Sequence, residues 1–288
     1  MLQLRTILAP IDFSARSHAT AEHAVHMANR FQSNLILVHV KEPIAYRYAE
    51  YTYAPGAEAE IDSHNQREMA ELVKAVTLGR PIETLLLEGE PAHRIETLIR
   101  ERKVDLVMMA THGYGTFRRF IVGSVTAKVL HDTACPVFTG AHMPEVAKFN
   151  PEPYKRVACA IDLKEGSERI LRWAADFAKA WEADLLVLHA APTLDVGENY
   201  SQWFPEDTRA MIVGHAKQEI EKLAAGAGCK PEMHVESADV VQYVKGKLNE
   251  AYADVLVIGR SRDTGVLGRL RTHAYALIRE SPCPVISV

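Results

Sequence analysis

The stretch TILAPID (6–12) returns later in the chain as VACAIDL (157–163), and this repetition decides the fold. Both copies are short apolar runs that contain an aspartate, Asp12 in the first and Asp162 in the second, 150 positions apart. Three further pairs of apolar segments repeat with offsets of 148 to 150 residues: LILVHV (35–40) with LLVLHA (185–190), VDLVMMA (104–110) with ADVLVIG (253–259), and TACPVFTG (133–140) with SPCPVISV (281–288). A period this constant indicates that a domain has been duplicated.

Helical patterns lie between these apolar runs. In the stretch 21–31, apolar residues return every three or four positions, which is typical of an amphipathic helix, and Ser14 or Ser17 is suited to its N-cap. The runs themselves are rich in β-branched residues, as strands covered on both faces are. Strands that alternate with helices predict parallel pairing through right-handed crossovers.

The sequence therefore predicts an α/β protein of two tandem, doubly wound, five-stranded parallel sheets, each with the strand order 3-2-1-4-5. The expected strands are 5–11, 35–40, 82–87, 104–110 and 135–139, then 156–161, 185–190, 231–236, 254–259 and 283–287. The expected helices after the second strand of each half are 58–77, 91–102 and 123–132, then 206–225, 240–251 and 272–280. Prolines in AHMPEVAKFNPEPYK (141–155) interrupt any helix there, so we expect domains 1–147 and 148–288.

Composition excludes several classes of protein. The 288 residues carry a net charge of -4 with a pI near 6.4, and no long run of Lys and Arg offers a surface to nucleic acid or to a membrane. No uncharged apolar stretch reaches the roughly 18 residues of a membrane span, and the first residues lack the apolar core of a signal peptide. Four cysteines without CxxC spacing fit a reducing compartment, and hence the cytoplasm.

One loop carries the chemistry expected of a ligand site. In a doubly wound sheet, ligands bind at the carboxyl ends of the strands where the strand order reverses, here between the first and fourth strands. The chain leaves the fourth strand at Ala110, passes Gly113 and enters a helix at Gly123-Ser124. Glycines let a ligand approach the backbone, and amides at a helix N-terminus attract phosphate oxygens, so the loop predicts a phosphate site. Ser124 is also expected to be the N-cap of that helix.

This loop resembles the ATP-binding loop of the universal stress protein family, whose pattern is G-x2-G-x9-G-[ST]. Gly113 and Gly123-Ser124 match the pattern, while Ala110 replaces its first glycine. The likeness spans the whole chain, once per half. Its other carriers in the first half are Pro10-x-Asp12, Val40, Gly89-x-Pro91 and the segment 134–137.

The resemblance implies an adenine nucleotide α-hydrolase-like fold that binds ATP in its first domain, with Mg²⁺ accompanying the nucleotide. Asp12 would lie near the ribose or adenine, Val40 would offer its backbone to the adenine edge, and the glycine loop would hold the phosphates. Asp12 could instead serve only as a helix cap. Ala110 would cost about 1–2 kcal/mol of binding free energy if its position required φ > 0 or a bare backbone against the ligand, and little as the last residue of a strand. The residues implied at the nucleotide are Pro10, Asp12, Val40, Ala110, Gly113, Gly123, Ser124 and Val125.

The second half departs from this pattern. It keeps Gly259, but Arg262 stands at the second glycine position and Thr272-His273 replaces the Gly-Ser pair. A bulky arginine would occupy the space of the phosphates, so one competent nucleotide site is expected per chain. Arg262 and His273 are expected to form ion pairs with acids such as Asp263, with a different anion site or a brace against the other half as the alternatives.

Other conspicuous residues have plainer explanations. His39 and His189 end matched strands, which favours a shared structural role over catalysis. Cys135 and Cys283 precede prolines at matched positions and are expected to pack in the core. The Tyr-rich segment 41–60 is a lid, a docking surface or a loop packed by its own tyrosines. No spacing of His, Cys, Asp and Glu suits a metal, so no protein-held metal is expected.

Together these patterns favour a cytoplasmic stress-response protein that acts by binding an adenine nucleotide. No catalytic residues are expected, because neither an HxGH loop, an SGGxDS loop nor a Walker GxxxxGK[ST] motif occurs. The alternatives are a nucleotide-independent or chaperone-like binding module and a slow ATPase. The resemblance also implies a homodimer or an intramolecular pseudo-dimer, in which the last strands of the two halves pair around a pseudo-two-fold axis. The expected partners are the nucleotide and a protein of unknown identity, with neither nucleic acid nor membrane.

Overall fold

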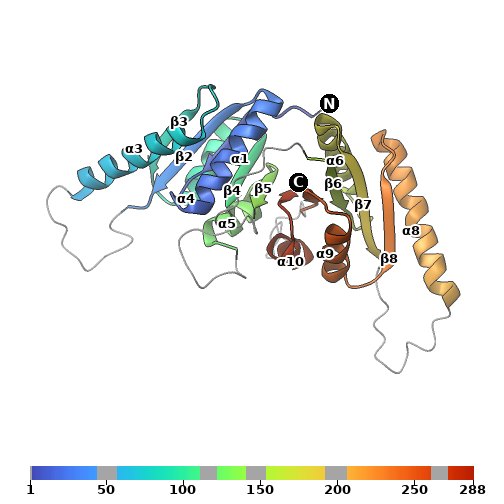
Figure 1. Cartoon of the computed structure of the whole chain (residues 1–288). Helices are drawn as coiled ribbons and strands as arrows, with labels where there is room; N and C mark the ends of the chain where they lie inside the picture. The colour runs from blue at the N-terminus through green and yellow to red at the C-terminus, as the bar shows by residue number, and fades with distance from the viewer. Residues whose placement is uncertain (1, 44–56, 111–121, 141–153, 192–205, 261–271) are drawn as a thin grey trace. The chain divides into compact units, whose positions relative to one another are not determined.

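The computed structural model describes residues 2–43, 57–110, 122–140, 154–191, 206–260 and 272–288. The chain divides into a first unit, Gln3–Pro151, and a second unit, Glu152–Val288, which also takes in the two N-terminal residues. Each unit is an α/β fold around its own parallel sheet (Figure 1). The expected fold class, two tandem doubly wound sheets, is confirmed.

In the first unit the strand order is β3-β2-β1-β4-β5, and all neighbouring strands are parallel. Right-handed crossovers place α1 and α3 on one face of this sheet and α4 and α5 on the other. The elements are β1 (Thr6–Pro10), α1 (Ala15–Phe31), β2 (Asn34–Lys41), α3 (Ala57–Val76), β3 (Glu83–Glu88), α4 (Pro91–Glu101), β4 (Leu106–Ala110), α5 (Ser124–Asp132) and β5 (Val137–Gly140).

The second unit repeats this plan with the order β8-β7-β6-β9-β10, again parallel throughout. Its central strands β6 and β9 are buried, as their uninterrupted apolar runs predict. The elements are β6 (Arg156–Ala160), α6 (Ser167–Trp181), β7 (Asp184–Ala191), α8 (Glu206–Ala227), β8 (Glu232–Ser237), α9 (Val240–Glu250), β9 (Val255–Ile258), α10 (Thr272–Glu280) and β10 (Val285–Ser287).

The observed elements begin and end within about two residues of the expected ones. The largest differences are of about two residues, for example in β4, which begins at Leu106 where the apolar run predicts a start at 104. The preceding Asp105 explains this difference. Its Oδ2 accepts the backbone amides of Arg5 at 2.7 Å and Thr6 at 3.0 Å, so the side chain takes the place of ladder hydrogen bonds at the start of β1.

The same clamp recurs in the second unit. Asp254 Oδ2 accepts the amides of Lys155 and Arg156, each at 2.7 Å. Each clamp joins the two strands that flank the reversal of strand order, and it does so at the amino edge of the sheet. The duplicated aspartate therefore joins the first and fourth strands of each unit at the edge of the sheet opposite the candidate ligand site.

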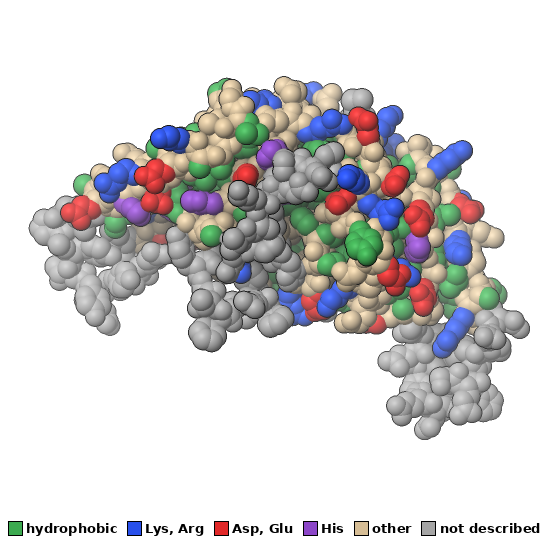
Figure 2. All heavy atoms as spheres, viewed as in Figure 1, with side chains coloured by type: hydrophobic (Ala, Val, Ile, Leu, Met, Phe, Trp, Pro, Cys, Tyr) green, Lys and Arg blue, Asp and Glu red, His purple; other side chains and the backbone are tan. Residues whose placement is uncertain are grey.

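The described surface mixes charges of both signs. Figure 2 shows acidic and basic side chains interspersed over the face in view. Among the described helices, none combines the length and the apolar character needed to cross a bilayer.

Candidate functional site

The carboxyl ends of β1 and β4 lie side by side in the first unit, as the register Ile7↔Leu106 and Leu8↔Val107 shows. The chain leaves β1 through a tight turn in which Asp12 Oδ1 accepts both the amide of Ser14, at 3.0 Å, and its hydroxyl, at 2.6 Å. Ser14 is the N-cap of α1, so Asp12 organises the turn and does not itself cap the helix. The carboxylate is thereby positioned at the reversal of strand order.

The residue after this aspartate has a left-handed backbone in both units. Phe13 has φ 60° and Leu163 has φ 58°, values that are uncommon for side chains of this size. In the first unit the Phe13 ring lies against His39, with centroids 4.4 Å apart. In the second, Asp162 Oδ1 accepts the Lys164 amide at 3.1 Å, which closes the equivalent turn.

His39 and His189 have the shared structural role expected of them. Nδ1 of His39 lies 2.8 Å from the carbonyl oxygen of Ile11, and Nδ1 of His189 lies 2.9 Å from that of Ile161. A carbonyl only accepts, so Nδ1 donates in each contact. Each histidine therefore joins the second strand of its unit to the turn that follows the first.

Strand β2 continues beyond the last residue of its neighbour β1, so the backbone groups at its end have no β1 residue opposite them. The register between these strands ends at Pro10↔Val38, and the amide of Ile11 bonds to the Val38 carbonyl at 2.8 Å. In a parallel ladder the N–H and C=O of one residue point to the same neighbour, and the direction repeats every second residue. The N–H and C=O of Val40 therefore face the side of β2 beyond the end of β1.

On its other side β2 is held by a glycine turn and an ion-pair cluster. Gly89 has φ 141°, and a Cβ there would lie 3.0 Å from Cγ of Arg94, so the position requires glycine. Its amide donates to the Lys41 carbonyl at 3.0 Å. The Lys41 ammonium lies 2.7 Å from Oδ1 of Asp62, on α3, and 3.6 Å from Oε2 of Glu88, on β3.

Sequence patterns missed this role of Lys41, although a lysine that ends an apolar strand was a visible signal. The hydrogen bond to the Asp62 carboxylate, with Glu88 and Glu58 nearby, raises the pKa of Lys41 above its ordinary value. Lys41 thus ties the end of β2 to the first turns of α3 and to the end of β3.

The start of α5 differs from the prediction. Gly123, not Ser124, is the N-cap, with φ -57° and ψ 147°, and no side chain caps the helix. Ser124 is an exposed first helical residue and Val125 is half-buried. The glycine takes the extended cap conformation, which shifts the serine one position into the helix. Thr126 Oγ1 donates to the Ala110 carbonyl at 2.9 Å and so ties the first turn of α5 to the end of β4.

Ala110 is the last residue of β4 and pairs with Gly140. Its backbone belongs to the strand and lies outside the left-handed region, so its methyl group carries no backbone strain. In the second unit a Cβ on the matching Gly259 would lie 2.2 Å from Cδ1 of Ile170. The first unit has the smaller Thr20 at the position of Ile170. Packing against the first helix, rather than a ligand, accounts for the glycine in the second unit.

The remaining site residues divide between described and undescribed parts of the chain. Pro10 ends β1, and His273 is an exposed residue in the first turn of α10. Arg260, next to Gly259, is 7% exposed. Gly113, Arg262 and most of the Tyr-rich segment 41–60 lie outside the described residues.

The two Cys-Pro cysteines pack in the core as expected. Both are buried, and Cys135 Sγ lies 3.2 Å from the Val104 carbonyl oxygen. Burial raises the pKa of Cys283 to about 11, which keeps it a neutral thiol. Within the described ranges, no group of three or more His, Cys, Asp or Glu side chains is arranged to hold a metal ion.

Comparison with known proteins agrees with this repeated architecture. The model of the universal stress protein family matches residues 3–139 and again residues 153–288. The chain belongs to the universal stress protein family. A universal stress protein of Methanocaldococcus jannaschii is 30% identical over 136 residues, which cover 46% of this chain and 79% of that protein. One from Thermus aquaticus is 33% identical over 137 residues, 46% of this chain and 96% of its own length.

A solved structure shares the fold over nearly the full length. The crystal structure of a universal stress protein from Archaeoglobus fulgidus superposes with a TM-score of 0.70 and covers 99% of this chain and 98% of its own, at 19% sequence identity. At this identity the likeness concerns the fold alone. The family and the fold are thus established for both halves.

Proposed function

We propose that this universal stress protein binds ATP at the reversal of strand order in its first domain and acts in the stress response through that binding. The observation that carries the proposal is the end of β2, where the N–H and C=O of Val40 face the gap beyond β1. One donor and one acceptor, side by side on a rigid strand, suit the edge of an adenine ring. Asp12 is held by its turn at the same edge.

The phosphate end of the site would be formed by the start of α5. The first amides of a helix have no acceptor within it, and the helix dipole favours an anion there. Gly123 leaves the approach to these amides free of a side chain, and Thr126 fixes this turn to Ala110 at the end of β4. The proposed site comprises Pro10, Asp12, Val40, Ala110, Gly113, Gly123, Ser124 and Val125.

Mg²⁺ would come with the nucleotide and neutralise its phosphates. This chain's own residues would bind and orient the nucleotide. None of the described residues at the proposed site forms a paired acid and base, so binding rather than turnover is the proposed activity, with slow hydrolysis as its upper limit. We further propose the domain boundary between residues 147 and 148, action in the cytoplasm, a dimer or pseudo-dimer of the two domains, and a protein partner.

The second domain is proposed not to bind a nucleotide in the same way. Its turn at Ala238 replaces the Gly89 turn, and Thr272-His273 stands in place of the Gly-Ser pair. Arg262 and His273 remain as a candidate anion site with a different ligand.

The test is to look for the nucleotide directly. If the purified chain carries its ligand, denaturing it should release about one adenine nucleotide per chain, which mass spectrometry detects. If it is purified without nucleotide, calorimetric titration with ATP and Mg²⁺ should show one binding site. Absence of binding at millimolar ATP would refute the proposal and favour a nucleotide-independent or chaperone-like module.

A further inference from the structure

An ion pair joins the two helices that begin at the ligand edge of the first unit. Lys128 lies in the second turn of α5, and its Nζ is 3.4 Å from Oε2 of Glu90. Glu90 is the N-cap of α4 and accepts the amide of His93 at 2.7 Å through the same oxygen. Both helices begin where their preceding strands end, so this ammonium lies at the carboxyl edge of the sheet.

Lysine is the member of this pair that is free to leave. Both side chains are about half exposed, 52% for Lys128 and 51% for Glu90, but Glu90 is also fixed by its bond to the His93 amide. Exposed ion pairs contribute little stability, so separating this one costs little. Although partial burial acts in the opposite direction, the His93 amide and the Lys128 ammonium lower the pKa of Glu90, which therefore stays ionised at neutral pH.

The helix geometry directs Lys128 toward the proposed phosphates. It follows Ser124 by four residues, so the two lie on the same face of α5. Side chains on a helix lean toward its N-terminus, which brings the ammonium toward the first-turn amides of Ser124 and Val125. An anion bound by these amides would lie within reach of the lysine.

We propose that Lys128 determines how many phosphates the site prefers, by leaving Glu90 for the terminal phosphate of a nucleoside triphosphate. The inference rests on the proposed ATP site. A terminal phosphate carries more charge than one carboxylate, and charge-assisted bonds to phosphate are the stronger ones. Adenosine has no group that could recruit the lysine.

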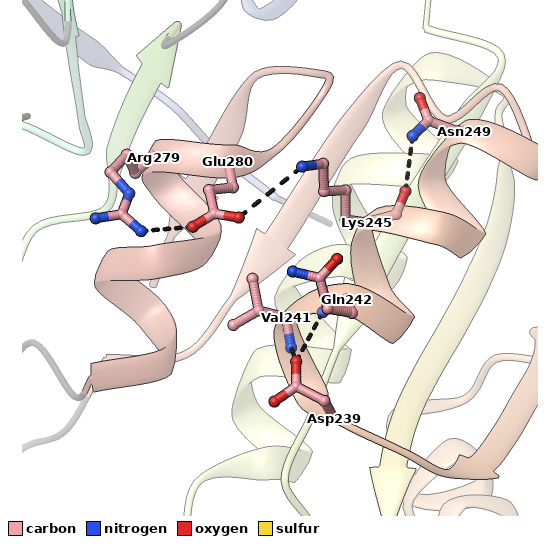
Figure 3. A network of polar contacts seen from close by, with 7 residues as sticks. All are labelled: Asp239, Val241, Gln242, Lys245, Asn249, Arg279 and Glu280. Atoms are coloured by element: carbon pink, nitrogen blue, oxygen red, sulfur yellow. Dashed lines mark hydrogen bonds and ion pairs between the residues drawn. The ribbon is translucent and has the colours of Figure 1, made fainter. Parts of the chain in front are cut away.

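Among the residues of the second unit that the structure describes, there is no equivalent of this pair. Ala276 stands at the position of Lys128, because α5 and α10 are each nine residues long and begin at Ser124 and Thr272. Asp239 caps α9 by accepting the amides of Val241 and Gln242 at 3.1 and 3.0 Å. Figure 3 shows the ion pair that joins its last two helices, α9 and α10. Nζ of Lys245, on α9, lies 3.9 Å from Oε2 of Glu280, the last residue of α10. That cation lies away from the carboxyl edge, where no ligand would recruit it.

The experiment titrates the full chain with ATP, ADP, AMP and adenosine and compares Lys128→Met with the wild type. We expect the affinity for ATP to fall about tenfold, as for loss of one charged hydrogen bond, and the affinity for adenosine to stay the same. Glu90→Gln keeps an oxygen for the His93 amide but releases the lysine. It should therefore raise the affinity for ATP and leave the affinity for adenosine unchanged. Arg100→Met is the control, because Arg100 is an exposed cation of α4 that lies 4.0 Å from Glu96 in the last turn, at the far edge.

The outcomes separate the inference from the function on which it rests. ATP affinity unchanged by Lys128→Met, an equal loss for all four ligands, or the same loss in Arg100→Met would overturn the role of Lys128 while the ATP site stands. Failure of the wild type to bind ATP would remove both.

Discussion

The two units share a scaffold and differ at the edge where a ligand would bind. In the first, the charged tie between the last two helices joins Lys128 to Glu90 at the carboxyl edge. In the second, it joins Lys245 to Glu280, away from that edge. The scaffold contacts beneath are repeated, as the clamps of Asp105 and Asp254 show. Duplication has thus kept what holds the sheet and changed what surrounds the ligand edge.

Glycine usage shows the same division. Gly89 in the first unit has a backbone that needs glycine, whereas its counterpart Ala238 is outside the set with positive φ. At the end of the fourth strand it is the second unit that has the glycine. Gly259 makes room for Ile170 there, whereas the first unit has Ala110 at the matching position. A glycine that matches a motif can therefore serve packing, and a missing one need not mark a lost site.

The largest expected effect comes from Gly123→Arg. Gly123 has φ -57°, which any residue adopts, so the arginine should add bulk at the start of α5 without backbone strain. We expect ATP binding to be abolished in calorimetric titrations of the full chain, because the side chain would fill the phosphate space.

Thr272→Arg is its matched control in the second unit and should bind ATP as the wild type does. If Gly123→Arg still bound ATP, or if Thr272→Arg lost it, the nucleotide would lie elsewhere and the proposed contrast between the units would be wrong.

Gly259→Ala tests the packing explanation. The added Cβ would lie 2.2 Å from Ile170 Cδ1, and such overpacking costs about 1–3 kcal/mol. All three tryptophans belong to the second half of the sequence, so unfolding of that half can be followed by tryptophan fluorescence in denaturant.

Adding Ile170→Thr copies the first unit and should relieve the crowding, so that the double variant is more stable than the sum of the single effects implies. Strictly additive effects would show that Ile170 is not what excludes a side chain at Gly259.

Gly89→Ala tests the strained turn beside Val40. Because φ is 141° and the Arg94 side chain lies against the glycine, we expect a loss of about 1–3 kcal/mol in the first unit. Hydrogen exchange of the β2 and β3 amides measures it. The matched Ala238→Gly should cost about 1 kcal/mol or less. Equal losses at both positions would contradict a special turn in the first unit.

Much of the fold could be predicted from the period of the repeat, because apolar runs and helical spacing report which residues face a core. The shared structural role of His39 and His189 followed from their matched positions, while their carbonyl partners did not. Contacts across elements were beyond such patterns. The spacing of residues does not show whether Lys41 contacts Asp62 or whether Gly259 contacts Ile170. These contacts depend on how the helices pack against the sheet. Ser124 was misplaced by one residue because either member of a Gly-Ser pair suits an N-cap.

The smallest expected difference concerns Lys41, whose counterpart is the buried Ala191. The bond to Asp62 raises the pKa of Lys41 in the folded chain. A cation whose pKa is higher when folded stabilises the fold fully below its unfolded pKa, about 10.4, and this contribution is lost as the pH rises through the folded pKa. Between about pH 9 and 12 the wild type should therefore lose more stability than Lys41→Met, by a few tenths of a kcal/mol, since Asp62 is half exposed. Denaturant unfolding followed by circular dichroism measures the loss, and tryptophan fluorescence should show the second unit unaffected. If the wild type and Lys41→Met lost stability in parallel, the ion pair would contribute nothing to the free energy of unfolding. The end of β2 would then be held only by the Gly89 turn and the sheet.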